Sequence, residues 1–178
     1  MKMRYLFAFL FIGLMAAGTA HSQESYDSKL YVKSAAFKYG ERIPIEYTCE
    51  GENISPQLSW TEGPENTVCY AIIVDDPDAP GGVWSHWVVY NIPAAKLTLS
   101  EDFERDESME IAYGSNDFDK LVYGGPCPPP GEKHRYYFKV YALDKMLEPD
   151  AELDREKLLK AMRGHIIAFG ELMGTFSR

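Results

Sequence analysis

The chain has 178 residues, of which 46% are hydrophobic and 25% are charged, and its formal net charge is -9. This length and composition are typical of one domain with a buried core. An acidic chain of this kind lacks the basic patch through which proteins bind nucleic acid by general electrostatics, so we expect no nucleic-acid partner.

The N-terminal segment has the pattern of a secretory signal peptide. Lys2 and Arg4 precede an uncharged apolar run over residues 5–16, and small residues follow at 18–20. A cleaved signal has this order of features. The alternative is an uncleaved anchor helix, but the apolar run is shorter than the ~20 residues that span a bilayer. We therefore expect export, to the periplasm or the medium.

Cleavage of this signal divides the chain into three parts. Residues 1–20 are expected to be removed, residues 21–28 to form a flexible mature N-terminus, and residues 29–178 to fold as a single domain. The sequence contains neither an internal repeat nor a linker of biased composition.

Most of the mature chain has the composition of β-strands. Val, Ile, Tyr, Phe and Trp are concentrated between turn residues such as Gly and Pro. The continuous apolar run at residues 68–74 fits a strand that is buried on both faces. The other expected strands span residues 29–37, 42–49, 58–60, 84–92 and 136–143.

One helix is expected near the C-terminus. Asp154 can cap its start, Leu153 can pack against Leu158 across the cap, and Gly164 can end it. The sequence thus predicts a mainly β fold, a sandwich or pair of mainly antiparallel sheets, with one late helix.

The three cysteines are Cys49, Cys69 and Cys127. An odd number leaves at least one thiol without an intrachain partner. Cys69 lies in the apolar run and is expected to be buried and reduced. Cys49 and Cys127 lie in predicted loops, where either a disulfide between them or two separate thiols fits the pattern. No CxxC or Cys/His spacing typical of a metal site is present.

Two distant segments each combine an acid, an imidazole and prolines. Asp76 begins a loop with prolines at positions 77 and 80 that leads to His86, and a loop with several prolines at 126–130 leads to His134. Proline fixes its own φ and restricts the residue before it, so both loops are expected to be rigid. Rigid loops suit a preformed pocket.

Strand alternation indicates which side chains share a face. On one expected strand, His86 shares a face with Val88 and Tyr90, and on another, His134 shares a face with Tyr136. If the two strands are neighbours, two imidazoles, a phenol and the carboxylates of Asp76 and Asp78 meet at one end of a sheet. Such a site can bind phosphate through hydrogen bonds and a protonated imidazole.

Several of these residues have a second reading. Asp76 can orient a histidine or receive the ammonium of an ethanolamine head group, and Asp78 can pair with Arg135. Trp84 and Trp87 can pack in the core or stack on a ligand, and packing is the preferred interpretation. Asp76, His86 and His134 are acceptable zinc ligands, but the spacing specifies no further ligand, so we expect neither a metal nor another cofactor.

These motifs resemble the phosphatidylethanolamine-binding protein family, also called Raf kinase inhibitor-like proteins, in its bacterial and archaeal branch. The resemblance covers roughly residues 29 to 177. It depends on the segments at 51–56, 76–80, 84–87, 123–136 and 170–176.

The resemblance implies a large central antiparallel sheet, a smaller second sheet and a peripheral helix. It also implies a pocket for a phosphate-like anion or a phosphoethanolamine head group, and a homodimer. The pocket residues implied are Asp76, His86, Pro129, His134 and Tyr136, with Asp78 and Gly125 close by.

We therefore expect a binding protein with no enzymatic activity. Members of the family also inhibit enzymes through their protein surface, so an inhibitor of a protease or another enzyme is the first alternative. A hydrolase or isomerase that uses Asp76 and a histidine in acid and base roles is the second.

The first testable prediction concerns processing. Small residues at 18–20 place the cleavage point so that the mature chain begins near His21 or Gln23. Intact-mass measurement of protein expressed with its full leader in a bacterial host should show this loss. A mass that retains residues 1–20 would contradict the prediction.

Overall fold

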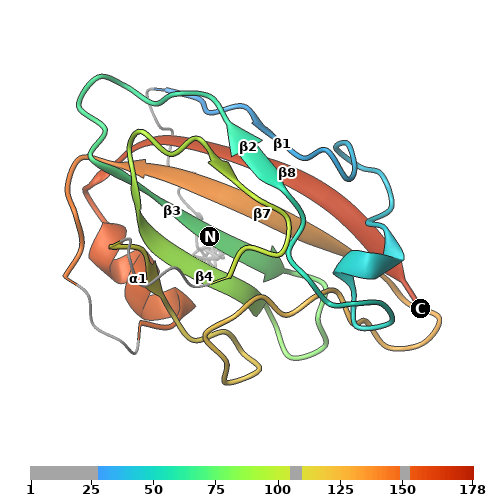
Figure 1. Ribbon diagram of the computed structural model, residues 1–178. Helices are drawn as coiled ribbons and strands as arrows, with labels where there is room; N and C mark the ends of the chain where they lie inside the picture. The colour runs from blue at the N-terminus through green and yellow to red at the C-terminus, as the bar shows by residue number, and fades with distance from the viewer. Residues whose placement is uncertain (1–27, 105–109, 149–152) are drawn as a thin grey trace, which may run out of the picture.

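Figure 1 shows the computed structural model of the chain, which describes residues 28–104, 110–148 and 153–178. The expected signal peptide at 1–20, and all but the last residue of the expected flexible segment 21–28, lie outside these ranges. Within them, no helix is both long enough and apolar enough to cross a membrane.

A five-stranded antiparallel sheet forms the centre of the molecule, in the order β6-β4-β3-β7-β8. Its three inner strands, which are long, follow the predicted apolar runs, and a fourth long strand near the C-terminus forms one edge. The bounds are β3 (Cys69–Asp76), β4 (Trp84–Pro93), β6 (Ala112–Tyr113), β7 (Lys133–Leu143) and β8 (Ile166–Ser177).

A smaller antiparallel sheet, in the order β1-β2-β5, lies over one face of the central sheet (Figure 1). The opposite face is covered by the helix α1 (Arg155–Met162). The small sheet consists of β1 (Val32–Lys33), β2 (Leu58–Trp60) and β5 (Thr98–Leu99). The predicted mainly β fold with two sheets and a late helix is confirmed.

The residues of β3 alternate between two hydrophobic cores, as the period of a strand requires. One set packs between the two sheets and the other packs towards α1, so every residue of β3 is buried. Tyr70, Ile72 and Val74 belong to the first core, and Cys69, Ala71 and Ile73 belong to the second, with Leu158 and Met162 of the helix. Cys69 is a buried free thiol, as expected.

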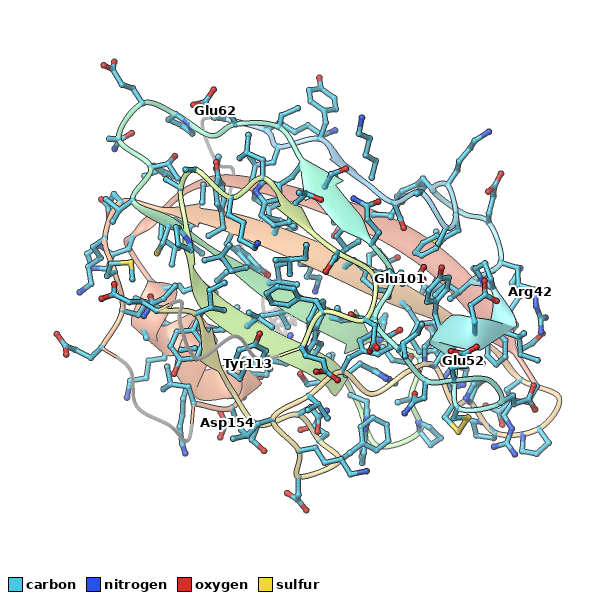
Figure 2. All side chains as sticks on the ribbon, viewed as in Figure 1. Arg42, Glu52, Glu62, Glu101, Tyr113 and Asp154 are labelled. Carbon is cyan, nitrogen blue, oxygen red and sulfur yellow. A yellow bond between two sulfur atoms is a disulfide. The ribbon has the colours of Figure 1, made fainter. Side chains whose placement is uncertain are left out.

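The helix has the predicted ends. Asp154 lies at its start (Figure 2), where the side-chain carboxylate accepts a hydrogen bond of 2.8 Å from the backbone N–H of Lys157. Leu153 and Leu158 are both buried. Gly164 follows the last turn with a φ of 79°, a conformation that favours glycine.

The predicted strands differ from the structure in three places. The strand expected at residues 29–37 is limited to β1 (Val32–Lys33). Residues 42–49 form no strand; they contain the short 3-10 helix η1 (Ile45–Tyr47), which follows Pro44. Strand β8 was not predicted, because Gly170 and Gly174 disfavour a strand. These glycines are required by close packing, since a Cβ on Gly170 would lie 2.2 Å from the carbonyl oxygen of Leu30.

One buried ion cluster joins the helix to the central sheet. The carboxylate of Asp75, at the end of β3, accepts hydrogen bonds from Lys139 Nζ at 2.8 Å and from Arg155 Nε at 2.9 Å. The Asp75 side chain is only 2% exposed. A buried carboxylate requires such partners, because an unpaired charge in the interior is strongly unfavourable.

The second prediction tests this cluster. We expect Asp75→Ala to lower the free energy of unfolding by about 3 kcal/mol, because two cations are then left partly buried without a partner. Urea denaturation measures the loss. The control is Asp144→Ala, which removes a half-exposed partner of His165 at 2.9 Å. Its expected loss is below about 1 kcal/mol, and equal losses for the two variants would contradict the role of Asp75.

Candidate functional site

A cavity of about 290 Å³ opens at the end of the central sheet where β3 ends and β7 begins. Its lining combines charged and imidazole side chains with aromatic and proline side chains. The lining residues are Asp76, Ala79, Pro80, Trp84, His86, Phe118, Cys127, Pro128, Pro129, His134 and Arg178.

Four of the residues proposed from the sequence line this cavity together, namely Asp76, His86, Pro129 and His134. Tyr136 lies behind them. It is fully buried, and its ring packs edge to face against His86 with 5.2 Å between the ring centroids. Burial, together with the nearby Asp76 carboxylate, raises the pKa of the Tyr136 hydroxyl, which therefore stays protonated.

A β-bulge in β4 determines where His86 points. Val74 pairs with Trp87, but Asp75 pairs with Ser85, so His86 is an extra residue with no partner on β3. Cross-strand partners share a face, and Trp87 packs in the core between the sheets. The bulge turns His86 to the face of Tyr136, whereas strict alternation would send it towards α1 with Val88.

His134 is held between two carboxylates. Its Nδ1 lies 2.8 Å from Asp76 Oδ2, and its Nε2 lies 3.2 Å from Glu132 Oε2. Burial lowers the pKa of His134, but the hydrogen bonds that its ring donates to these two carboxylates outweigh burial, and the net pKa is raised above its ordinary value. The second oxygen of Asp76 accepts a hydrogen bond from the backbone N–H of Asp78 at 2.9 Å. Asp76 therefore orients His134.

His86 has the opposite electrostatic environment. Burial lowers its pKa, and the hydrogen bond to the Gly124 carbonyl oxygen only partly opposes that effect. Because a carbonyl oxygen can only accept, Nδ1 of His86 donates this 2.6 Å bond. The neutral ring then carries a lone pair on Nε2. The cavity thus combines a histidine that favours the charged state with one that favours the neutral state.

Asp78 does not line the cavity. Its two carboxylate oxygens receive Arg135 Nη2 at 2.6 Å and Arg135 Nε at 2.8 Å, and the backbone N–H of Arg135 donates to it as well. These bonds lower the pKa of Asp78 to about 2. The pairing of Asp78 with Arg135, one of the two readings of the sequence, is the arrangement present.

Gly125 is also outside the cavity lining. Its backbone N–H donates to Asn53 Oδ1 at 2.7 Å. A Cβ at this position would lie 2.5 Å from the carbonyl oxygen of Tyr47 and 2.8 Å from the Cα of Thr48. Gly125 therefore allows the loop that carries Pro129 to pack closely against the segment around η1.

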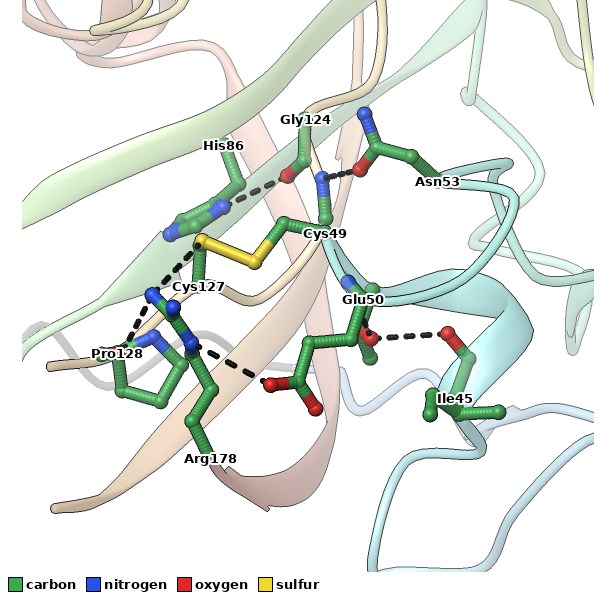
Figure 3. Close-up of a disulfide and its surroundings, with 11 residues drawn as sticks. Ile45, Cys49, Glu50, Asn53, His86, Gly124, Cys127, Pro128 and Arg178 are labelled. Carbon is green, nitrogen blue, oxygen red and sulfur yellow. Dashed lines mark hydrogen bonds and ion pairs between the residues drawn. A yellow bond between two sulfur atoms is a disulfide. The ribbon is translucent and has the colours of Figure 1, made fainter. Parts of the chain in front are cut away.

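A disulfide joins these two segments. Cys49 and Cys127 are bonded, which decides between the alternatives that the sequence left open. The backbone N–H of Cys49 also donates to the carbonyl oxygen of Pro126 at 3.1 Å. Cys127 lines the cavity next to Pro128 and Pro129, so the bridge fixes the proline wall (Figure 3).

Sequence reasoning missed three lining residues. Trp84, read as a packing residue, is exposed at the cavity, and its ring contacts Phe118 with 5.5 Å between centroids. Phe118 also packs edge to face on His86 at 5.4 Å. Arg178 follows β8 and reaches the cavity beside Cys127. The position of Trp84, two residues before His86 in the same motif, could have indicated it from the sequence. No sequence pattern indicated Phe118 or Arg178.

Among the residues that the structure describes, no group of three or more His, Cys, Asp or Glu side chains is arranged to hold a metal ion. The carboxylate of Asp76 is committed to His134 and to the backbone of Asp78.

Comparison with known proteins gives concordant results. A family model described as phosphatidylethanolamine-binding protein matches residues 33–177. A UPF0098 protein of Methanothermobacter thermautotrophicus is 45% identical over 149 residues, which cover 83% of this chain and 98% of that protein. A UPF0098 protein of Archaeoglobus fulgidus is 41% identical over 98% of this chain, which spans 60% of the length of that relative.

Two solved structures have the same fold. A phosphatidylethanolamine-binding protein homologue, CT736 of Chlamydia trachomatis, superposes with a TM-score of 0.78 at 41% identity and covers 85% of this chain and 99% of its own. E. coli YbcL, described as a member of the mammalian PEBP family, superposes with a TM-score of 0.78 at 34% identity over the same shares.

The third prediction tests the close approach at Gly125. Gly125→Ala places a methyl group against backbone atoms of the η1 segment, and we expect a loss of about 1–3 kcal/mol in the free energy of unfolding. Gly81→Ala is the matched control, because a Cβ on Gly81 meets nothing within 4 Å. Thermal denaturation compares them. If both variants have the melting temperature of the wild type, Gly125 is not constrained by packing.

Proposed function

This chain belongs to the phosphatidylethanolamine-binding protein family, and we propose that it is an exported protein that binds a phosphate-like anion in the cavity described above. The anion is free phosphate or the phosphate of a phosphoethanolamine head group. The observation that carries the proposal is the pair of imidazoles, His134 and His86, which have opposite protonation tendencies at one cavity wall.

The two histidines suit a phosphate in complementary ways. A protonated His134 supplies positive charge to the partly water-excluded cavity. Its Nε2 faces the exposed carboxylate of Glu132 at 3.2 Å, so an anion that replaces Glu132 there receives a charge-assisted hydrogen bond. Neutral His86 supplies an acceptor at Nε2 once Nδ1 donates to Gly124. The second pKa of a phosphate monoester is about 6. Close to neutral pH the group therefore has oxygens that accept hydrogen bonds and, in its monoanionic form, a hydroxyl that donates one.

The phosphate, more than the ammonium, is the group that this cavity recognises. Both carboxylate oxygens of Asp76 already accept hydrogen bonds, one from His134 and one from the backbone of Asp78. An ethanolamine ammonium would have to share them. We therefore expect phosphate and phosphoethanolamine to bind with similar affinity.

Export and a homodimer complete the proposal. Export is based on the signal-like pattern at residues 1–20. The homodimer is supported by exposed apolar side chains at and near the cavity, which a second copy can cover. They lie in the loop before β4, at the first residue of β4 and in the segment after β6. They are Val83, Trp84, Phe118, Leu121 and Val122.

The fourth prediction is a pH dependence of binding, measured by titration calorimetry with sulfate, whose charge does not change in the range tested. The anion prefers the imidazolium form of His134, so binding takes up a proton and weakens as pH rises through the pKa of the free protein. Because the pKa of His134 is raised above 6.5, this fall is expected above pH 6.5. We expect about tenfold weakening, which corresponds to a shift of one pKa unit on binding.

The variant His134→Gln keeps a hydrogen-bond donor for Asp76 and removes the titration, so its affinity should be weak and independent of pH. His165→Gln is the control, because His165 also pairs with a carboxylate, Asp144, at 2.9 Å but lies outside the cavity lining. Wild-type affinity that does not change with pH would contradict the role given to His134. Failure of phosphate, phosphoethanolamine and sulfate to bind at all would overturn the proposed function.

A further inference from the structure

Arg178 contributes a guanidinium to the mouth of the cavity from the residue after β8. Its Nη1 lies 3.5 Å from the carbonyl oxygen of Pro128 and 3.7 Å from Sγ of Cys127, and its Nε lies 3.5 Å from Glu50 Oε1 (Figure 3). The backbone N–H of Gly131 donates to the Arg178 carbonyl oxygen at 3.2 Å. The main chain is thus anchored, whereas the guanidinium is held only by long contacts.

The guanidinium of Arg135 provides a contrast within the same chain. Arg135 donates to both carboxylate oxygens of Asp78, from Nη2 at 2.6 Å and from Nε at 2.8 Å. Every polar contact found for the Arg178 guanidinium among the described residues is 3.5 Å or longer. Since a guanidinium has five N–H donors, Arg178 can still donate two short parallel hydrogen bonds to an oxyanion.

The charges around the cavity show what this guanidinium adds. Among the lining residues, Arg178 carries the only permanent positive charge, and Asp76 carries a negative one. Both ring nitrogens of His134 already face carboxylates, and His86 presents a lone pair when it is neutral. An anion that entered without Arg178 would meet little net attraction above the pH at which His134 loses its proton.

We propose that Arg178 is a further anion-binding residue of this site, and that its guanidinium donates two hydrogen bonds to two oxygens of a phosphate or sulfate group. This inference deepens the proposed anion binding and therefore rests on it. Glu50 acts as an internal competitor, which pairs with Arg178 until the anion replaces it.

The disulfide positions Arg178. Glu50 follows Cys49 directly, and Pro128 follows Cys127 directly, so all three groups that contact the Arg178 guanidinium belong to the bridged cysteines or to the residues next to them. Both bridged cysteines are solvent-exposed, whereas Cys69 is buried, so a reductant can reach the bridge selectively. Opening the bridge releases the two segments that hold the guanidinium, and affinity for the anion falls.

The test compares the affinity of the full chain for sulfate and inorganic phosphate, by titration calorimetry at fixed pH and ionic strength. We expect Arg178→Ala to weaken binding by about tenfold or more, as loss of hydrogen bonds to a charged group predicts. Arg178→Lys keeps the positive charge but loses the two parallel N–H donors of the guanidinium, so its affinity should lie between those of wild type and Arg178→Ala. Arg163→Ala, an equal charge change at the end of α1 and away from the cavity, should bind within about twofold of wild type.

Positioning is tested by two further comparisons. Glu50→Gln should tighten binding by about two- to fivefold in wild type, the range expected for a partly exposed ion pair, and should have no effect in the Arg178→Ala background. Reductant should weaken binding by wild type towards the affinity of Arg178→Ala and should change that variant little. Near-ultraviolet circular dichroism verifies that the reduced protein remains folded.

The outcomes separate the two proposals. If wild type binds sulfate or phosphate and Arg178→Ala binds equally well, the role of Arg178 is overturned while the proposed function stands. If wild type binds neither anion, the proposed function fails, and this inference fails with it. If reductant, or Glu50→Gln, changes affinity equally in wild type and in Arg178→Ala, the bridge and Glu50 do not act through Arg178.

Discussion

Two adjacent buried carboxylates at the end of β3 set the plan of the molecule. Neighbouring residues in a strand point to opposite faces of the sheet. The side chain of Asp75 therefore points towards α1, and that of Asp76 lines the cavity. Each buried charge requires partners: Asp75 has Lys139 and Arg155, and Asp76 has His134. One dipeptide therefore holds the helix, the neighbouring strand β7 and the cavity in a fixed relation.

The second constraint is the bulge that turns His86. Without the extra residue opposite Asp75, regular alternation would place His86 in the core beside α1, and the cavity would contain a single imidazole. The bulge instead packs His86 against Tyr136 and Phe118, where burial favours the neutral ring. The pairing of a neutral with a charged histidine thus depends on an irregularity in one strand.

The sequence predicted the features that have local patterns. The apolar run of β3 and the cap at Asp154 were readable because burial and capping have fixed periods and residue types. Strand β8 was not, because Gly170 serves a close contact with Leu30, and Gly174 one with Ile43, that only the folded chain creates. The bulge at His86 and the approach of Arg178 to the cavity also depend on contacts between distant segments, which no local pattern reports.

A rigid wall matters more for this cavity than a large number of donors. A small anion has few atoms, and even the best small ligands gain at most about 1.5 kcal/mol per non-hydrogen atom. Such a ligand cannot also supply the free energy needed to order loops. Here the Cys49–Cys127 bridge, the prolines at 128–130 and the close packing of Gly125 order the wall during folding. In the binding that we propose, the free energy can then go into the contacts of the anion with His134, His86 and Arg178.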